Sequence, residues 1–321
     1  MLPRMLLALA VAVAAAPAAL AQAYPVKPVR VIVTFPPGGT PDIYGRVMAA
    51  ELQRIWSQSV VVENRTGAGG TIGSDYVAKA PPDGYTLLFA ADATITIAPH
   101  LYSKLPYDPV RDFAPIVNVA AGPFVLMANP AFAPNNVKEL IALVQSQPGK
   151  VSYASSGAGG QQHLAMEYIR TMAGSMDMIH VPYKGFGQGI ADVLANQVPL
   201  IFGGITASIQ LTKSGKLKAL AVTGPKRAKA LPNVPAVAET LPGFDITAWY
   251  GFLAPAGTPR EIVKKIHDDS VAVIQRPDFL ERLDRDGIEP VGNTPEEFAA
   301  QIKTDLAHWA KIVKAAGAKL D

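Results

Sequence analysis

The chain has 321 residues, no cysteine and a formal net charge of +3. The absence of cysteine excludes thiolate metal sites, cysteine nucleophiles and disulfides, and a chain of this length can bury enough surface without disulfides. Lysine and arginine do not cluster into a basic stripe, so a nucleic-acid partner is not expected. The length predicts two domains of ordinary size.

The first 23 residues have the pattern of a secretory signal peptide. Arg4 supplies a short positive region, residues 5–15 are apolar, and small residues follow with overlapping A-x-A sites at residues 19–21 and 21–23. The apolar run is shorter than the roughly 20 residues that a membrane-spanning helix needs. A retained N-terminal anchor is the alternative, but it would leave the cleavage site unexplained. We therefore expect residues 1–23 to be removed on export to the periplasm.

Strands and helices alternate along the rest of the chain, which predicts α/β domains with mostly parallel sheets. In the first third, Thr40 is expected to cap a helix that has Pro41 in its first turn and ends near Trp56. A second helix is expected after the glycines at 67–70. The strands expected there are residues 29–35, 60–63 and 85–90.

A second set of strands and helices begins near residue 124. The expected strands are residues 124–128, 151–154, 179–182, 199–202, 219–222 and 247–253. The helices expected between them are residues 136–146, 161–172 and one that ends near 195. Three helices close the chain, and the last, residues 295–316, has apolar side chains at helical spacing.

The two sets predict two lobes of similar topology. Crossings are expected near residues 119–123 and 244–248, which gives a first lobe of residues 24–120 plus 247–321 and a second of residues 121–246. Two crossovers form a hinge. Open α/β sheets bind ligands at the carboxyl ends of their strands, so we expect a ligand between the lobes.

Two loops are candidates for binding an anion. One contains Phe35, Gly38, Gly39, Thr40 and Asp42, and leads into a helix whose first amides and positive dipole end suit an anion. An ordinary strand-to-helix turn is the alternative.

The other loop lies in the second lobe and contains Ser155, Ser156, Gly160 and Gln161. It also joins a strand to a helix and offers two hydroxyl groups. A flexible linker is the alternative here, but the loop mirrors the first one across the expected cleft.

Patterns typical of nucleotide binding and catalysis are absent from the sequence. Residues 65–71 are rich in glycine but lack the spacing of a dinucleotide fingerprint, and no P-loop or G-x-S-x-G motif occurs. The five histidines are scattered without metal-ligand spacing, and His163 is interpreted as a packed helix residue. We therefore expect neither an enzyme nor a bound metal or cofactor.

Many short segments in order along the chain identify a family. The chain resembles the substrate-binding proteins of tripartite tricarboxylate transporters, the Bug receptors. The matching segments are residues 24–30, 35–42, 62–70, 82–87, 105–115, 180–185, 220–223, 253–259 and 294–298.

The resemblance implies a type II-like, two-lobed periplasmic binding protein that holds a small carboxylate without a cofactor. Its partners would be two integral membrane subunits of the transporter, and we expect a monomer. Carried onto this chain, the ligand loops are residues 35–42 and 155–161, with residues 90–94 and 203–206 as weaker candidates. The predicted ligand-binding residues are Phe35, Gly38, Gly39, Thr40, Asp42, Ala91, Asp92, Ser155, Ser156, Gly160, Gln161, Phe186, Gly203, Gly204 and Trp249.

Three departures from the common family pattern bear on the ligand. Thr40 and Pro41 precede Asp42, Gly203 and Gly204 replace an acidic or amide pair, and Phe186 stands where small residues are usual. The loss of the acid argues against an amino-acid ligand, although Asp92 could substitute. The hypothesis is an aromatic or extended carboxylate near Phe186 or Trp249. A ligand sensor for a signalling partner and a secreted α/β hydrolase are the alternative functions.

Overall fold

We describe the protein from a computed structural model that covers residues 24–174 and 176–320. The predicted signal peptide, residues 1–23, lies outside the described residues. Among the residues that are described, no helix is both long enough and apolar enough to cross a membrane.

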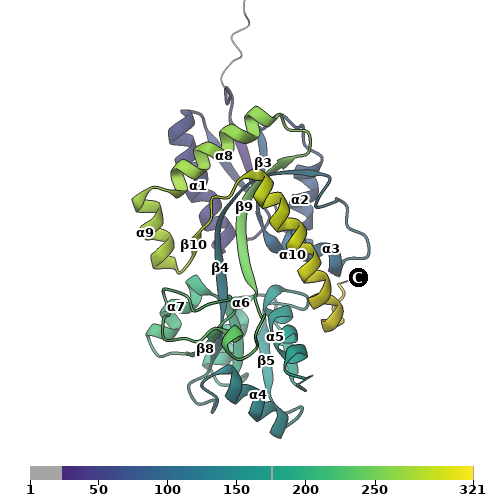
Figure 1. Ribbon diagram of the computed structural model, residues 1–321, viewed down its shortest axis with the longest axis vertical. Coiled ribbons are helices and arrows are strands. Elements are labelled where there is room, and N and C mark those ends of the chain that lie inside the picture. Colours follow the sequence, from purple (N-terminus) through teal and green to yellow (C-terminus); the bar gives the residue numbers. More distant parts are fainter. Residues whose placement is uncertain (1–23, 175, 321) are drawn as a thin grey trace, which may run out of the picture.

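The first third of the chain forms one end of the molecule (Figure 1). Its strands are β1 (Val29–Val33), β2 (Val60–Asn64) and β3 (Thr86–Ala91). Its helices are α1 (Thr40–Trp56), the 3₁₀ turn η1 (Ala68–Gly70), α2 (Thr71–Ala78), the π-helical turn η2 (Ala93–Ile97) and α3 (Ala98–Leu101).

The long strand β4 (Phe113–Ala128) leads to the other end of the molecule. There follow α4 (Val137–Ser146), β5 (Ser152–Ser155), α5 (Gln161–Met172), β6 (Ile179–Pro182), α6 (Phe186–Leu194), β7 (Leu200–Gly204), α7 (Ile205–Lys213), β8 (Lys218–Val222) and the turn η3 (Val237–Glu239). The chain then returns through β9 (Thr247–Pro255) to α8 (Arg260–Ile274), α9 (Pro277–Asp286), β10 (Glu289–Pro290) and α10 (Pro295–Ala316).

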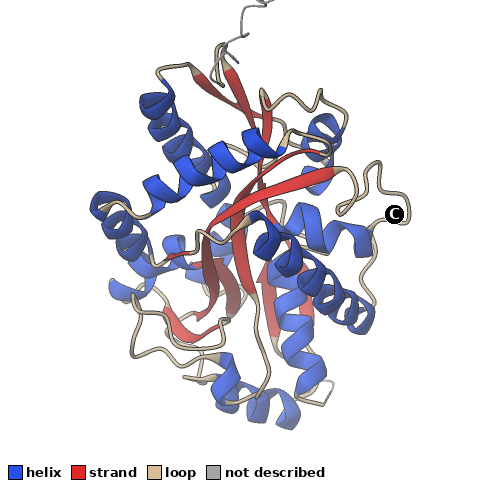
Figure 2. Cartoon of the chain, turned by 45° about the horizontal axis from the view of Figure 1, so that its top comes forward, coloured by secondary structure: helices blue, strands red, loops and turns tan. Residues whose placement is uncertain are grey.

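The strands form one continuous sheet with helices on both sides (Figure 2). Their order is β2-β1-β3-β9-β4-β7-β5-β6, with β8 and β10 also paired to β4. Pairing is parallel at the two ends, where β1 joins β2 and β3, and β5 joins β6 and β7. It is antiparallel where β9 and β4 cross the middle. The two-lobed α/β fold is therefore confirmed, with a mixed sheet.

Strand β4 belongs to both halves of the sheet. From Phe113 to Pro123 it pairs with β9, and from Phe124 to Ala128 it pairs with β7 and β8. The sequence predicted only its second part as a strand, because Pro115, Gly122 and Pro123 interrupt the pattern. The pairing of β4 with β9 is irregular: its register shifts between Pro115 and Val117 and again between Asn118 and Ala120. Both predicted crossings fall where β4 and β9 pass between the halves, and the residue limits of the lobes stay a prediction.

The start of α1 corrects one expectation. Gly39, not Thr40, is the N-cap, and no side chain caps the helix. The Thr40 hydroxyl group instead lies beside the phenol of Tyr250 on β9. Asp42 accepts a hydrogen bond from the backbone N–H of Gly38 at 3.0 Å, which satisfies one of the amides ahead of the helix.

A glycine in β9 allows the close approach of β4. A Cβ atom added to Gly251 would lie 2.5 Å from the carbonyl oxygen of Val117 and 3.0 Å from both the Cα of Asn118 and the ring of Phe298. Two of these neighbours are backbone atoms inside a ladder and cannot move without breaking it.

We predict that Gly251→Ala lowers the free energy of unfolding by about 2 kcal/mol or more, because it overpacks the ladder that joins the two halves. Denaturant unfolding without ligand measures the change. Gly187→Ala in α6 is the matched control: nothing lies within 4 Å of its added Cβ atom. The control should be neutral or stabilise by up to about 1 kcal/mol, since alanine is the better helix former. Equal stability of the two variants would contradict this account.

Candidate functional site

A cavity of about 620 Å³ lies where the two predicted loops meet. Of the predicted residues, six line it: Phe35, Gly39, Ser156, Gly160, Gln161 and Phe186. Two strand–loop–helix junctions border the cavity, one before α1 and one before α5. The two junctions belong to opposite halves of the sheet. Both helices begin beside the cavity, so both positive dipole ends act on it.

Asp42 holds the first loop in place and does not line the cavity. Its carboxylate accepts hydrogen bonds from Gly38 N, from Arg46 Nε at 2.9 Å and from Asn64 Nδ2 at 2.7 Å. Burial opposes its ionisation, but these bonds outweigh burial and lower the pKa of Asp42 below its ordinary value. Asn64 also donates to the carbonyl of Phe35 at 3.0 Å, which ties the start of the loop to β2.

Ser155 holds the second loop in a similar way. Its side chain is fully buried, and its Oγ accepts from the backbone N–H of Gly157 at 3.2 Å. The same Oγ lies 2.6 Å from Nε2 of His180 on the neighbouring strand β6. Ser156, one residue further, lines the cavity and donates to Oε1 of Gln162 at 2.8 Å. Of the two predicted hydroxyl groups, only that of Ser156 belongs to a cavity-lining residue.

Behind this loop lies a stack of three rings. His163 and His180 are stacked with centroids 4.0 Å apart, and Tyr153 stacks on His180 at 5.0 Å. His163 accepts a hydrogen bond at Nδ1 from the N–H of Gly159 at 3.1 Å, so the stack supports the loop at a second point. Burial, with a smaller contribution from His163, lowers the pKa of His180 to about 4. Burial also lowers the pKa of His163, so both imidazoles are neutral at pH 7.

The sequence missed the contact between Ser155 and His180, which has the geometry of a nucleophile–base pair. The signal was present: Tyr153 pairs with His180 in the β5–β6 register, and Ser155 lies two residues along on the same face. However, Ser155 is fully buried and its oxygen is already bonded to Gly157. The contact of Ser155 with His180 therefore holds the loop that begins at Ser155 in place, and it does not form a nucleophile–base pair that a ligand could reach.

A hydrogen bond between Gln161 and Asp92 connects the halves beside the cavity. Gln161 at the start of α5 donates through Nε2 to Oδ2 of Asp92, at the end of β3, at 2.7 Å. Asp92 is only 1% exposed, and its Oδ1 has no hydrogen-bond partner among the described residues. Burial raises the pKa of Asp92 well above its ordinary value. The neighbouring Ala91 is buried in the core cluster and does not line the cavity.

Phe186 forms part of the cavity wall, and Gly203 makes room for its ring. A Cβ atom at Gly203 would lie 2.9 Å from the ring of Phe186 and 2.7 Å from side-chain atoms of Met127 and Ser208. Gly203 thus affects the cavity through Phe186 without lining it. Gly204 has open space around it and is the N-cap of α7, a helix that the sequence analysis did not predict.

Trp249 lies away from the cavity. It is 1% exposed, packs edge-on against Phe298 of α10 and donates from its indole nitrogen to Asp305 at 2.9 Å. Tyr250, the next residue along β9, points to the opposite face of the strand, toward Thr40 and Asp92. The structure therefore gives Trp249 a core position rather than a place in the cavity wall.

Several apolar residues of the wall were not predicted. They come from the segment after β3 and from the last described residues: Ile97, Ala98, Leu101, Tyr102 and Leu320. Ala93, which also lines the cavity, belongs to the weaker candidate loop of residues 90–94. Leu320 donates its backbone N–H to the carbonyl of Leu101 at 3.0 Å. Its side chain lies beside Gly159 of the other half, so the chain end crosses the rim of the cavity. Leu320 belongs to no repeating pattern, so the sequence carries no signal for this role.

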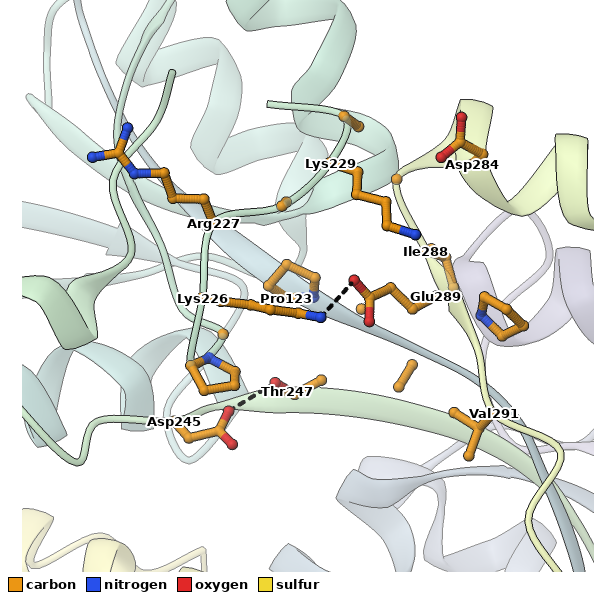
Figure 3. Close-up of a pocket in the computed structure, with 18 of the residues that line it drawn as sticks. Pro123, Lys226, Arg227, Lys229, Asp245, Thr247, Asp284, Ile288, Glu289 and Val291 are labelled. Atoms are coloured by element: carbon orange, nitrogen blue, oxygen red, sulfur yellow. Dashed lines mark hydrogen bonds and ion pairs between the residues drawn. The ribbon is translucent and has the colours of Figure 1, made fainter. Parts of the chain in front are cut away.

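A second cavity of about 540 Å³ lies beside the crossing strands, and its charged side chains include both signs (Figure 3). Lys226 points across it to Glu289, with the charged atoms 3.6 Å apart. Asp245 accepts from Thr247 at 2.8 Å. Only the first cavity receives two helix N-termini from opposite halves, so we take the first as the candidate ligand site. In the described part of the chain, no group of three histidine or acidic side chains could hold a metal ion.

The fold and this cavity define a two-lobed solute-binding protein. The profile of the tripartite tricarboxylate transporter family receptor matches residues 44–318. The chain belongs to this family, and it is a binding receptor rather than an enzyme.

Three similar proteins illustrate the relationship. BugT of Bordetella pertussis is 36% identical over 303 residues, which are 94% of this chain and 92% of BugT. The structure of Rpa4515 of R. palustris with adipate has a TM-score of 0.84 and 33% identity, and covers 92% of this chain and 100% of that one. The structure of MatC from Rhodopseudomonas palustris with bound malate has a TM-score of 0.79 and 31% identity, and covers 90% of this chain and 100% of that one.

The neutral histidine stack predicts a loss of stability in acid. An unfolded histidine takes up a proton near pH 6.5, whereas His180 in the folded protein does so only near pH 4. The unfolded state therefore binds more protons between these values, and stability falls as the pH falls from about 6.5 to about 4. His180→Gln should flatten this part of the curve of Tm against pH, measured without ligand. His267→Gln, on α8, is the control, and an equal flattening there would contradict the assignment to His180.

Proposed function

We propose that this protein is a periplasmic receptor that binds a small organic carboxylate with an apolar body and delivers it to the membrane subunits of a tripartite transporter. Residues 1–23 would direct its export, and the receptor would act as a monomer. The observation that carries the proposal is the cavity shared by the N-termini of α1 and α5.

The polar part of the cavity suits a carboxylate. Helix N-termini present unpaired backbone N–H groups and the positive end of the helix dipole, which together favour an anion. The cavity lining includes no lysine, arginine or acidic residue. Ser156 adds a hydroxyl group and Gln161 an amide. An anion held by backbone dipoles can leave again without breaking a strong ion pair, which suits a delivery protein.

The rest of the cavity suits a hydrocarbon. Its walls include Phe35, Ile97, Leu101, Phe186 and Leu320. A volume of about 620 Å³ lies within the usual range for small-molecule sites. Adipate in the structure of Rpa4515 and malate in that of MatC are both small carboxylates. These features together support an extended or aromatic carboxylate as the ligand.

Thermal-shift measurements with adipate, malate, benzoate and glutamate test the proposal. A ligand that binds only the folded protein should stabilise it by RT ln(1 + [L]/Kd), about 2.7 kcal/mol at one hundred times Kd. We expect adipate or benzoate to give the larger shifts, since their hydrocarbon parts fill the apolar wall. If no carboxylate shifts Tm, the proposed function fails. If glutamate alone does so, the preference for an apolar body is wrong.

Phe186→Ala should weaken binding of the best carboxylate by about tenfold to one hundredfold, because about 1.5–3 kcal/mol of apolar contact is lost when an aromatic wall is removed. Isothermal titration calorimetry measures the change. Phe132→Ala is the matched control, since Phe132 is a partly buried phenylalanine of the same half outside the cavity lining. Equal losses in the two variants would place the site elsewhere.

A further inference from the structure

The segment that follows α10, residues 317–320, lies at the rim of the ligand cavity. Helix α10 ends at Gly317, whose left-handed conformation (φ 60°) turns the chain away from the helix axis. Leu320 then donates its backbone N–H to the carbonyl of Leu101, the last residue of α3, at 3.0 Å. Leu101 and Leu320 both line the cavity. The segment is therefore attached to the part of the rim that the first half of the sheet supplies.

The side chain of Leu320 reaches the other half of the protein. A Cβ atom added to Gly159 would lie 3.1 Å from Cγ and Cδ1 of Leu320 and 3.2 Å from Cδ2. Gly159 belongs to the loop between β5 and α5 and also lines the cavity. Because glycine has no side chain, the isobutyl group of Leu320 can pack directly against the backbone of this loop. Helix α10 itself contacts both α3 and α5 (Figure 1), so its end is placed to bridge the two halves.

The contact across the rim can break without disturbing either half. Two backbone hydrogen bonds hold the segment: one from Ala318 to Val313 at 3.4 Å, in the turn that ends the helix, and the one from Leu320 to Leu101. Neither of them joins the two halves. The contact of Leu320 with Gly159 is apolar, and Leu320 is 39% exposed. Contacts between apolar atoms are individually weak, so Leu320 can leave the loop while α10 and the sheet stay intact.

We propose that residues 317–320 form a strap that gates the ligand cavity. The strap is closed when Leu320 packs on Gly159, and it lifts to let a carboxylate pass in or out. The inference rests on the proposed function of the cavity as a carboxylate site. Gly317 is the point at which the strap turns, because its left-handed backbone lies between the helix and the strap. Leu320 thus governs how fast the ligand exchanges rather than which ligand is recognised.

A gate and a wall residue differ in their effects on the binding rates. A gate must open before the ligand passes in either direction, so weakening it raises the association and dissociation rate constants by the same factor and leaves Kd unchanged. A wall residue makes its contact only after the ligand is bound, so its loss raises the dissociation rate constant and Kd. Measuring both rate constants therefore distinguishes a strap from a part of the wall.

The first test is Leu320→Ala with adipate and benzoate as ligands. Stopped-flow tryptophan fluorescence gives both rate constants from the observed rate against ligand concentration, and isothermal titration calorimetry gives Kd. We expect both rate constants to rise by about threefold to tenfold, as for the loss of a partly buried apolar contact, with Kd within about twofold of the wild type. Leu194→Ala is the matched control and should change neither rate, because Leu194 is similarly exposed (42%) but ends α6 outside the cavity lining.

A disulfide that locks the strap is the opposite test. The chain has no cysteine, so Gly159→Cys combined with Leu320→Cys can form a single intramolecular disulfide. A Cβ atom at residue 159 lies close enough to the side chain of residue 320 for this bond. Oxidation should lower both rate constants by about tenfold or more, and reduction with dithiothreitol should restore them. The reduced variant is the control for the strain that cysteine meets at residue 159, where φ is +73°.

The outcomes separate the strap from the receptor. If Leu320→Ala raises the dissociation rate constant alone, or changes neither rate constant, Leu320 is not a gate and the strap is wrong. The strap is equally wrong if the oxidised double variant exchanges ligand as fast as the reduced one, or if the disulfide does not form. In each of these cases the carboxylate receptor stands. If neither adipate nor benzoate binds to the wild type, the proposed function fails and the strap fails with it.

Discussion

The antiparallel ladder between β4 and β9 is the constraint on which the rest of the structure depends. Both strands run from one half of the sheet to the other, and β4 is long enough, at 16 residues, to pair with β9 in one half and with β7 and β8 in the other. Among the described residues, these two strands alone make the crossing within the sheet, so a change in their bend or twist would move one half relative to the other. The helices that start at the carboxyl ends of β1 and β5 lie on the two sides of this ladder, so the predicted hinge motion would open or close the cavity between them.

Two buried aspartates beside the cavity differ in how their charge is balanced. Asp42 has three donors, including Arg46, and stays ionised, which fixes the backbone that approaches the ligand. Asp92 has the Gln161 side chain and no cation, and its ionised form is disfavoured. The same residue type is thus favoured in its charged or its neutral form according to whether a cation and several donors surround it.

The sequence predicted most of the fold because its signals are local. Helix α1 follows from the proline in its first turn and α10 from its apolar spacing, and the strand–glycine–helix junctions were predicted as the place of the candidate site. The first half of β4 and the contact of Ser155 with His180 were missed for a common reason: both depend on which strands become neighbours. Trp249 was placed in the site on chemical grounds, but alternation along β9 turns it toward Phe298 and leaves Tyr250 toward the cavity side.

Local sequence signals are readable and contacts between distant segments are not, which explains why ligand identity is harder to infer than ligand class. The end of the cavity at α1 and α5 is built from backbone groups, so many sequences can form it and it selects only for a carboxylate. The rest of the wall depends on side chains whose positions are set indirectly: Gly203, for example, leaves room for the ring of Phe186. A substitution of Gly203 by a larger residue would move Phe186 without touching the ligand. Ligand specificity in this receptor therefore depends on the residues that position the side chains of the cavity wall. Those residues can be identified only from the folded structure.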